Sequence, residues 1–477
     1  MDLRATLMGA FTKTRLRALA FAAFIALVWL NQSIGGKDWE ALRDRTFADP
    51  QAHLTELVRW PFLFLYRRSG DEAIYFATAS ATLGLPYDTE VFAQRGDSPL
   101  PPVTTPVDGR FHVPYAEIPF EYPPPNVPFV LAPRLVTSRF TTYAYVFGAL
   151  MGVLLLAAAA IGARIGARRG GDPRDSEAHR IFAFGLLLLA HGSIAVQRLD
   201  AIVALLAVLM VRSAARDDDR GLGLWGGLIG AAKFVPVLLL PAIVLASGIR
   251  DRKRLLTISL FAALGLGLGL GPMVVLGRES LPLILTYHAA RGLHVESSLG
   301  VVYGAVKAVL GMREASTMDY GSFNFHGPVS QLLAKASTFV TLGLVAVVLR
   351  ASTRKREAAP ESDEAREQRT WRIVLAALAT MSALWLGGKV FSPQYLTWAL
   401  PLVIAVPGRG WRRIAVSLGV ILVISQVYLR GFYDHVYNQW PAGVITMVIR
   451  LAVLIAFFLV FVRALRAERA QPAVDAQ

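Results

Sequence analysis

Long apolar runs recur along the chain, and short polar segments rich in Lys and Arg separate them. Because about 20 apolar residues in a helix cross the hydrocarbon core of a bilayer, this pattern predicts an all-α integral membrane protein with about 12 transmembrane helices. Several runs are shorter than this, so their ends must be bent or lined by protein. The runs lie at about 18–30, 138–161, 181–196, 199–212, 221–232, 234–249, 255–276, 329–349, 371–387, 394–407, 413–429 and 441–462.

The first run follows a basic segment, an arrangement typical of a signal sequence as well as of a first membrane span. Residues after 30 show no small-x-small cleavage motif that leads into a soluble domain. We therefore expect an uncleaved span. Residues 60–66 are apolar but too short to cross, so we expect a helix that lies in the membrane interface.

Lys and Arg gather in every second loop. Since basic loops stay on the cytoplasmic side of a membrane, we expect both termini in the cytoplasm of a plasma-membrane protein that forms one domain over residues 1–477. The long loops 31–137 and 277–328 then lie outside, and residues 350–372 form a charged cytoplasmic linker. The basic segments lie at 4–17, 164–180, 212–220, 250–254, 350–372, 409–413 and 463–469, and hold 29 of the 49 Lys and Arg residues.

Composition narrows the class of protein. Hydrophobic residues make up 54% of the chain and charged residues only 17%, against about 25% charged in soluble domains, which excludes an ordinary soluble enzyme. The net charge of +15 would suggest a nucleic-acid partner in a soluble chain, but here the cytoplasmic loops explain it, so no such partner is expected. Cysteine is absent, which excludes disulfides and thiolate metal sites.

Ionisable residues at the outer ends of the apolar runs are candidates for function, because a charge inside a bilayer costs about 2.5–3.5 kcal/mol. Arg198 and Asp200 lie in the turn between two runs, where a salt-bridged turn is the structural alternative. Lys233 and Lys389 have no carboxylate nearby in the sequence, which favours an anionic ligand. Snorkelling to the interface is the alternative for each.

The loop 277–328 contains Arg291, His294 and Glu296 within six residues. Arg and His can donate to phosphate oxygens, while Glu can accept from a sugar hydroxyl or orient the His. An ordinary solvated loop is the alternative. A zinc site is disfavoured because these residues lack a known ligand spacing, so no residue is assigned as a metal ligand.

Other patterns have structural interpretations. Residues 69–87 predict an amphipathic helix with Ser69 or Asp71 as its N-cap and Gly84 at its end, and capping is the structural alternative for Asp71. The Pro-rich segment 120–125 predicts an extended approach to the membrane. The alternating glycines at 265–271 indicate close helix packing. The three Asp residues at 217–219 are interpreted as a solvated charge run.

Short motifs that combine charged, aromatic and Pro residues follow one another between about residues 70 and 400. They are Asp71-x-x-x-Tyr75, Gly84-x-Pro86-Tyr87, Phe120-x-Tyr122-Pro123-Pro124, Gln197-x-x-Asp200, Lys233-x-x-Pro236, the segment from Arg291 to Ser297, and Phe391-Ser-Pro-Gln-Tyr395.

This series resembles the polyprenol-phosphate-mannose-dependent α-mannosyltransferase family of bacterial membrane glycosyltransferases, which has the C-type glycosyltransferase fold. No single motif is specific, and the resemblance rests on their order. The segment between the first apolar run and Asp71 is longer than the family leads us to expect. Asp38 is therefore a rival for the position just outside the first span.

The resemblance implies transfer of a hexose, mannose in the family, from a polyprenyl-phosphate sugar to a hydroxyl of a lipid or glycan acceptor. The reaction would invert the anomeric centre on the outer face of the membrane, with no cofactor beyond the lipid-linked co-substrate. Asp71 is the implied general base. The candidates for the donor phosphate are Lys233, Arg291, His294 and Lys389, and those for the sugar or acceptor are Gln197, Glu296, Tyr122 and Tyr395.

A lipid or solute transporter is the alternative function. The same basic residues would then form its substrate site, and Asp71 would only cap a helix. Many transporters contain internal repeats, and we find none in this sequence. The long outer loop also favours a catalytic or recognition surface.

Overall fold

The computed structural model describes residues 18, 71–86, 108–118, 120, 122–167, 176–277, 280–312, 316–353, 362–408, 410–429 and 433–470. Helices account for 79% of them. Within these ranges, five helices are long and apolar enough to cross a membrane, which supports the predicted membrane environment. These five are α8 (Phe140–Gly166), α13 (Arg252–Leu276), α16 (Pro328–Ser352), α17 (Asp363–Gly387) and α21 (Pro441–Ala470).

The apolar runs predicted after residue 137 all coincide with helices, either alone or with an adjoining 3-10 turn. Twelve spans remain a prediction, because the shorter helices lie below the usual span length and the first run lies outside the described residues except for Ala18. The shorter helices are α6 (Asp71–Thr82), α7 (Val127–Val136), α9 (Glu177–His191), α10 (Asp200–Ala215), α11 (Asp219–Lys233), α12 (Leu239–Ala246), α14 (Ser280–Ala290), α15 (Ser298–Val309), α18 (Leu400–Ala405), α19 (Trp411–Val427) and α20 (Tyr433–Tyr437). The 3-10 turns are η3 (Pro124–Asn126), η5 (Ser193–Ala195), η6 (Val235–Leu238) and η7 (Pro393–Ala399).

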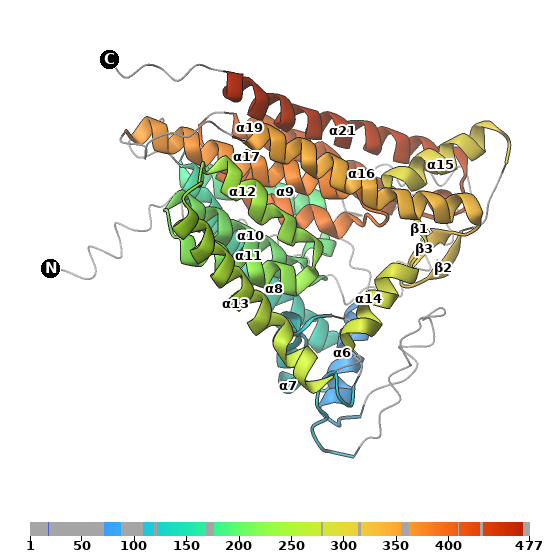
Figure 1. The fold of residues 1–477 in the computed structure, drawn as a ribbon. Coiled ribbons are helices and arrows are strands. Elements are labelled where there is room, and N and C mark those ends of the chain that lie inside the picture. The colour runs from blue at the N-terminus through green and yellow to red at the C-terminus, as the bar shows by residue number, and fades with distance from the viewer. Residues whose placement is uncertain are drawn as a thin grey trace.

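The helices run between two ends of the molecule, as Figure 1 shows. One end holds the turn between α10 and α11 and the start of α13, and we call it the charged end. The other holds α6, α14, α15 and a small sheet, and we call it the loop end. The described parts of the two predicted outer loops therefore lie at the same end of the molecule.

Helix α17 lies in the middle of the helical layer, and α13 and α16 lie at its outside. In the apolar 18-residue stretch of each helix, 89% of α17 is buried inside the protein, but only 22% of α13 and 17% of α16. Leu256, Leu260 and Leu268 of α13 are exposed. Apolar side chains that face outward over the length of a helix fit a lipid environment.

The alternating glycines of α13 divide between two faces. A Cβ on Gly265 would lie 2.4 Å from the carbonyl oxygen of Leu224, and one on Gly269 would lie 2.3 Å from the Cβ of Ala231. Both contacts are with α11, so the predicted close packing is confirmed for these two glycines. Gly267 and Gly271 have no described atom within 4 Å of such a Cβ.

A three-stranded antiparallel sheet lies at the loop end, which an all-α expectation did not include. Its strands are β1 (Leu293–His294), β2 (Thr317–Asp319) and β3 (Ser322–Phe325), in the order β1-β3-β2. The strands are too short for an alternating pattern to predict them. Leu293 and Phe325 pair across the sheet and belong to a small core with Tyr428 and Val436.

Helix α6 begins at Asp71, and Gly84 follows it with φ +63°. A Cβ on Gly84 would lie 2.3 Å from the carbonyl oxygen of Arg110, so the predicted ending at this glycine is confirmed. The Pro-rich segment is extended at Pro123 but then forms the turn η3, which the sequence did not predict. The predicted interfacial helix at 60–66 and the rival Asp38 lie outside the described residues.

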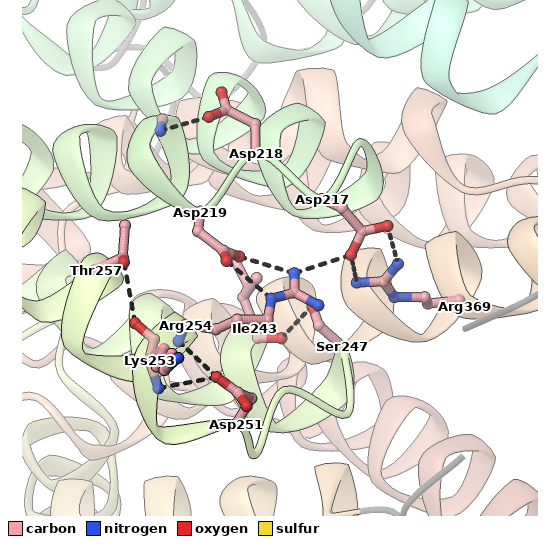
Figure 2. A network of polar contacts seen from close by, with 11 residues as sticks. Asp217, Asp218, Asp219, Ile243, Ser247, Asp251, Lys253, Arg254, Thr257 and Arg369 are labelled. Carbon is pink, nitrogen blue, oxygen red and sulfur yellow. Dashed lines mark hydrogen bonds and ion pairs between the residues drawn. The ribbon is translucent and has the colours of Figure 1, made fainter. Parts of the chain in front are cut away.

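Asp217 and Asp218 are exposed, as a solvated charge run would be, but Asp217 and Asp219 also form a network of ion pairs that the sequence did not predict (Figure 2). Asp217 accepts from Arg369 at 2.7 Å and Arg254 at 2.9 Å, and Asp219 accepts from Arg254 at 2.8 Å. Asp218 caps α11 by accepting from the backbone N–H of Gly221. The Arg369 guanidinium, followed by that of Arg254, lowers the pKa of Asp217 to about 2 although burial opposes the shift.

Candidate functional site

Asp71 lies at the first turn of α6 in a polar set at the loop end. Its Oδ2 forms an ion pair with Nη1 of Arg198, and the Tyr122 hydroxyl donates to the same oxygen at 3.4 Å. The Tyr75 hydroxyl donates in turn to the Tyr122 hydroxyl at 3.3 Å. The side chain of Asp71 is 27% exposed. A hydroxyl group of a ligand can therefore reach this carboxylate.

Asp200 and Lys233 form a second, more enclosed pair beside the first. The Asp200 side chain is 3% exposed, and its Oδ1 accepts from Nζ of Lys233 at 2.5 Å. It also accepts from Nε1 of Trp398 at 2.5 Å. Lys233 lies 4.4 Å from the ring centroid of Tyr395. The sequence-based view of Lys233 as a cation without a carboxylate was wrong, because Asp200 is remote in the sequence but adjacent in space.

The turn between η5 and α10 connects these two pairs. Arg198 and Asp200 do not close a salt-bridged turn on themselves, as the structural alternative proposed. Instead Arg198 reaches Asp71 and Asp200 reaches Lys233. Gln197 precedes them, and it is 6% exposed and accepts from the Ser193 hydroxyl at 3.3 Å. The turn therefore brings α6 and α11 to one place.

Lys389 follows α17 and contacts the loop after α14. Its Nζ donates to the carbonyl oxygens of Ala289 at 2.9 Å and Arg291 at 3.0 Å. Nε of Arg291 donates to the Ser322 hydroxyl of β3 at 3.1 Å. Within the described ranges, neither cation has a carboxylate partner. Burial, followed by the charge of Arg291, lowers the pKa of Lys389.

The segment from Lys389 to Tyr395 joins the two sets of residues. The rings of Phe391 and Tyr395 lie 6.3 Å apart, and Tyr395 carries Lys233 over its face. His288, on the surface of α14, lies close enough to both sets for their charges to shift its pKa. Its pKa falls to about 4 through loss of hydration and then through the charges of Arg291, Lys233 and Lys389. Several cations therefore act on one region that holds a reachable carboxylate.

His294 and Glu296 lie behind this region. Each side chain is 3% exposed, and Nε2 of His294 lies 3.6 Å from Oε1 of Glu296. Glu296 accepts from the Tyr428 hydroxyl and pairs with Nη1 of Arg450 at 3.5 Å. Burial raises the pKa of Glu296, and Arg450 opposes the shift. Both predicted ligand contacts are thus enclosed by protein, which differs from the expected direct contact with phosphate or sugar.

Arg450 is the residue of this region that sequence reasoning missed. It lies in α21, is 1% exposed at its side chain and donates to the backbone oxygen of Glu296 at 2.6 Å. Its guanidinium lies 4.8 Å from the ring centroid of Phe391. An Arg inside the apolar run 441–462 was a visible signal, because such a charge needs an enclosed partner. Within the described residues, no group of three or more His, Asp or Glu side chains forms a metal-holding arrangement.

Comparisons with protein-family models, with curated proteins and with solved structures find no match to this chain.

Proposed function

We propose that the protein is a plasma-membrane hexosyltransferase that uses a polyprenyl-phosphate sugar. The hexose, mannose in the family that the motifs resemble, would pass to a hydroxyl of a lipid or glycan acceptor. The proposal includes the C-type glycosyltransferase fold, twelve spans and a loop end that faces away from the cytoplasm. The observation that carries it is the meeting of a reachable carboxylate, Asp71, with the cations Lys233, Arg291 and Lys389 at one end of a helical, lipid-compatible protein.

Asp71 acts as the general base in this proposal. Its carboxylate takes the proton of the acceptor hydroxyl as the hydroxyl oxygen attacks C1 of the sugar. Arg198 holds this carboxylate in place through their ion pair. The acceptor hydroxyl must take over part of the contact that Arg198 or Tyr122 makes with Asp71 in this structure.

Positively charged groups stabilise the leaving phosphate in this proposal. The bond between C1 and the phosphate oxygen breaks, its electron pair stays on that oxygen, and the polyprenyl phosphate gains a negative charge. Donors that are fixed before this charge develops lower the barrier, because they need no reorganisation. Arg291 and Lys389 are the described cations of the site whose partners are a hydroxyl and backbone oxygens instead of carboxylates. They can therefore take on an anionic ligand without losing an ion pair.

Transfer of radiolabel from a polyprenyl-phosphate hexose to a membrane lipid extract tests the proposal on the purified full chain. We expect labelled glycolipid or glycan from the parent protein and none from Asp71→Asn. Asp363→Asn is the matched control, because Asp363 is fully exposed at the start of α17. Loss of transfer in Asp38→Asn with full activity in Asp71→Asn would move the base to the rival position. Failure of the parent protein with every polyprenyl-phosphate hexose would overturn the proposal.

A further inference from the structure

A cavity lies at the charged end, and the proposed active site lies at the other end of the helices. It has a volume of about 160 Å³, roughly ten times the 10–15 Å³ that one water molecule needs. Three helices border it, α8, α10 and α17. Its lining consists of Ile161, Arg164, Ile165, Arg212, Ala215, Arg216 and Thr370.

The cavity collects cations with few anions to match them. Arg164 lies 3.9 Å from Glu177, at the outer limit of an ion pair, and its side chain is 69% exposed. The guanidinium groups of Arg212 and Arg216 form no hydrogen bond or ion pair with another described residue, and Arg216 bonds only through its backbone N–H, to Ser213 and Ala214. The neighbouring network is different, because Asp217 and Asp219 there neutralise the cations that they contact (Figure 2).

Compensation of helix dipoles does not account for this grouping. Arg164 lies in the last turn of α8 and Arg212 in the last turn of α10, where a cation stabilises the helix end. That effect needs one cation at each end and does not require them to share a cavity. Arg216 follows the end of α10 and adds a third positive charge to the same space.

The rest of the lining indicates a ligand with a polar and an apolar part. Ile161, Ile165 and Ala215 present apolar surface beside the guanidinium groups. The Thr370 hydroxyl donates to the backbone oxygen of Arg366, so its oxygen remains able to accept a hydrogen bond. Guanidinium groups bind phosphate oxygens through paired N–H donors. Basic pockets between membrane helices are suited to phosphate-bearing lipid headgroups.

We propose that this cavity binds a phosphate ester, at the depth where the headgroups of anionic phospholipids lie. The site is separate from the proposed donor site and does not depend on the proposed activity. Binding there would join α8, α10 and α17 through one anion.

Binding of defined probes to the purified full chain in a neutral detergent tests this proposal. The probes are a short-chain phosphatidylglycerol, a phosphatidylcholine with the same chains, and inorganic phosphate. The concentration dependence of thermal stabilisation gives an apparent Kd for each. We expect phosphatidylglycerol to bind at least about tenfold more tightly than phosphatidylcholine, because the quaternary ammonium of phosphatidylcholine offsets the charge of its phosphate and is repelled by the guanidinium groups. Equal affinity for inorganic phosphate would assign the site to a soluble phosphate instead of a lipid.

Matched variants test whether the phosphatidylglycerol probe binds in this cavity. Arg212→Gln with Arg216→Gln should weaken it about tenfold, and Ala215→Phe should weaken it by filling the cavity while all charges stay. The control is Arg413→Gln with Arg463→Gln, which removes two exposed cations elsewhere and should bind as the parent does. Three results would each overturn the proposal. They are a loss of affinity in the control pair as large as in Arg212→Gln with Arg216→Gln, unchanged affinity in Ala215→Phe, and equal affinity of the parent for phosphatidylglycerol and phosphatidylcholine.

Discussion

The charged end and the loop end both hold ionisable side chains but arrange them differently. In the network of the charged end, Arg254 faces two carboxylates and Asp217 faces two guanidinium groups. At the loop end, Arg291 and Lys389 contact a hydroxyl and backbone oxygens. Cations that already have carboxylate partners have little to gain from an added anion. Arg291 and Lys389 therefore make the loop end the more suitable place for an anionic substrate. The ion pairs of the charged-end network are more suited to holding helices together.

The largest effect should come from the buried pair behind the loop end. Removing one partner of a buried ion pair leaves the other charge without compensation, which costs about 3–5 kcal/mol. We expect Arg450→Met to lower the melting temperature of the purified protein strongly. The double variant Glu296→Gln with Arg450→Met should regain much of that loss. Equal stability of Arg450→Met and the parent would show that this pair does not hold the loop end together.

Next in size is the effect of neutralising a cation of the proposed active site. Lys389→Gln removes a charge that donates to Ala289 and Arg291, and a charge-assisted donor to phosphate is worth roughly 1.5–3 kcal/mol. We expect transfer to fall about tenfold to a hundredfold, with a larger effect on turnover than on the apparent constant for the donor. Unchanged transfer kinetics in Lys389→Gln and in Arg291→Gln would remove both residues from the site.

The ion pairs of the charged end should matter less than either. Arg369 pairs with Asp217, whose side chain is 51% exposed, and exposed pairs contribute about 0–1 kcal/mol. We expect Arg369→Gln to reduce thermal stability slightly, with a smaller loss at high salt, and to leave transfer unchanged. A transfer defect as large as that of Lys389→Gln would contradict the division of roles between the two ends.

A pH dependence of stability is the smallest effect that we expect, because His288 is exposed and solvent weakens the interactions that shift its pKa. Its pKa falls from 6.5 to about 4 in the folded protein, so between these values the unfolded chain binds more protons than the folded one. Stability therefore rises with pH across this window and is lost as pH falls from 6.5 to 4. His288→Gln should flatten the melting temperature over that range. An identical pH profile in parent and variant would show that His288 makes no such contribution.

The sequence predicted the helices well and the side-chain partners poorly. Each apolar run after residue 137 became helical, because apolar length is a local property that a single sequence carries. The partner of Lys233 is 33 residues away, and Glu296 meets Arg450 at a separation of 154 residues. Contacts of that kind depend on how helices pack, which no local pattern encodes. The same reason explains why the ion pairs of Asp217 and Asp219 were not predicted, because their guanidinium partners lie 35 to 152 residues away in the chain.

The structure brings together some of the residues that the sequence assigned to a site, while their function stays a prediction. Asp71, Tyr122, Lys233 and Tyr395 meet around one turn, and their grouping was predicted from a family resemblance. The enclosed positions of His294 and Glu296 were not predicted, because a cluster of polar residues in a loop does not show whether a later helix will cover it. The small sheet was missed because strands of two to four residues leave no periodic signal.

The link between Glu296 and Arg450 also bears on the order in which the protein is made. Helix α21 follows every other described helix in the chain, so a ribosome releases Arg450 after all the residues that Arg450 must neutralise. Until then, Glu296 and the ring of Phe391 lack their guanidinium partner. The loop end can therefore reach its final packing only after synthesis has passed this helix, while the charged-end network, complete by Arg369, can close earlier. Biogenesis of this protein then finishes at the end where we place its chemistry.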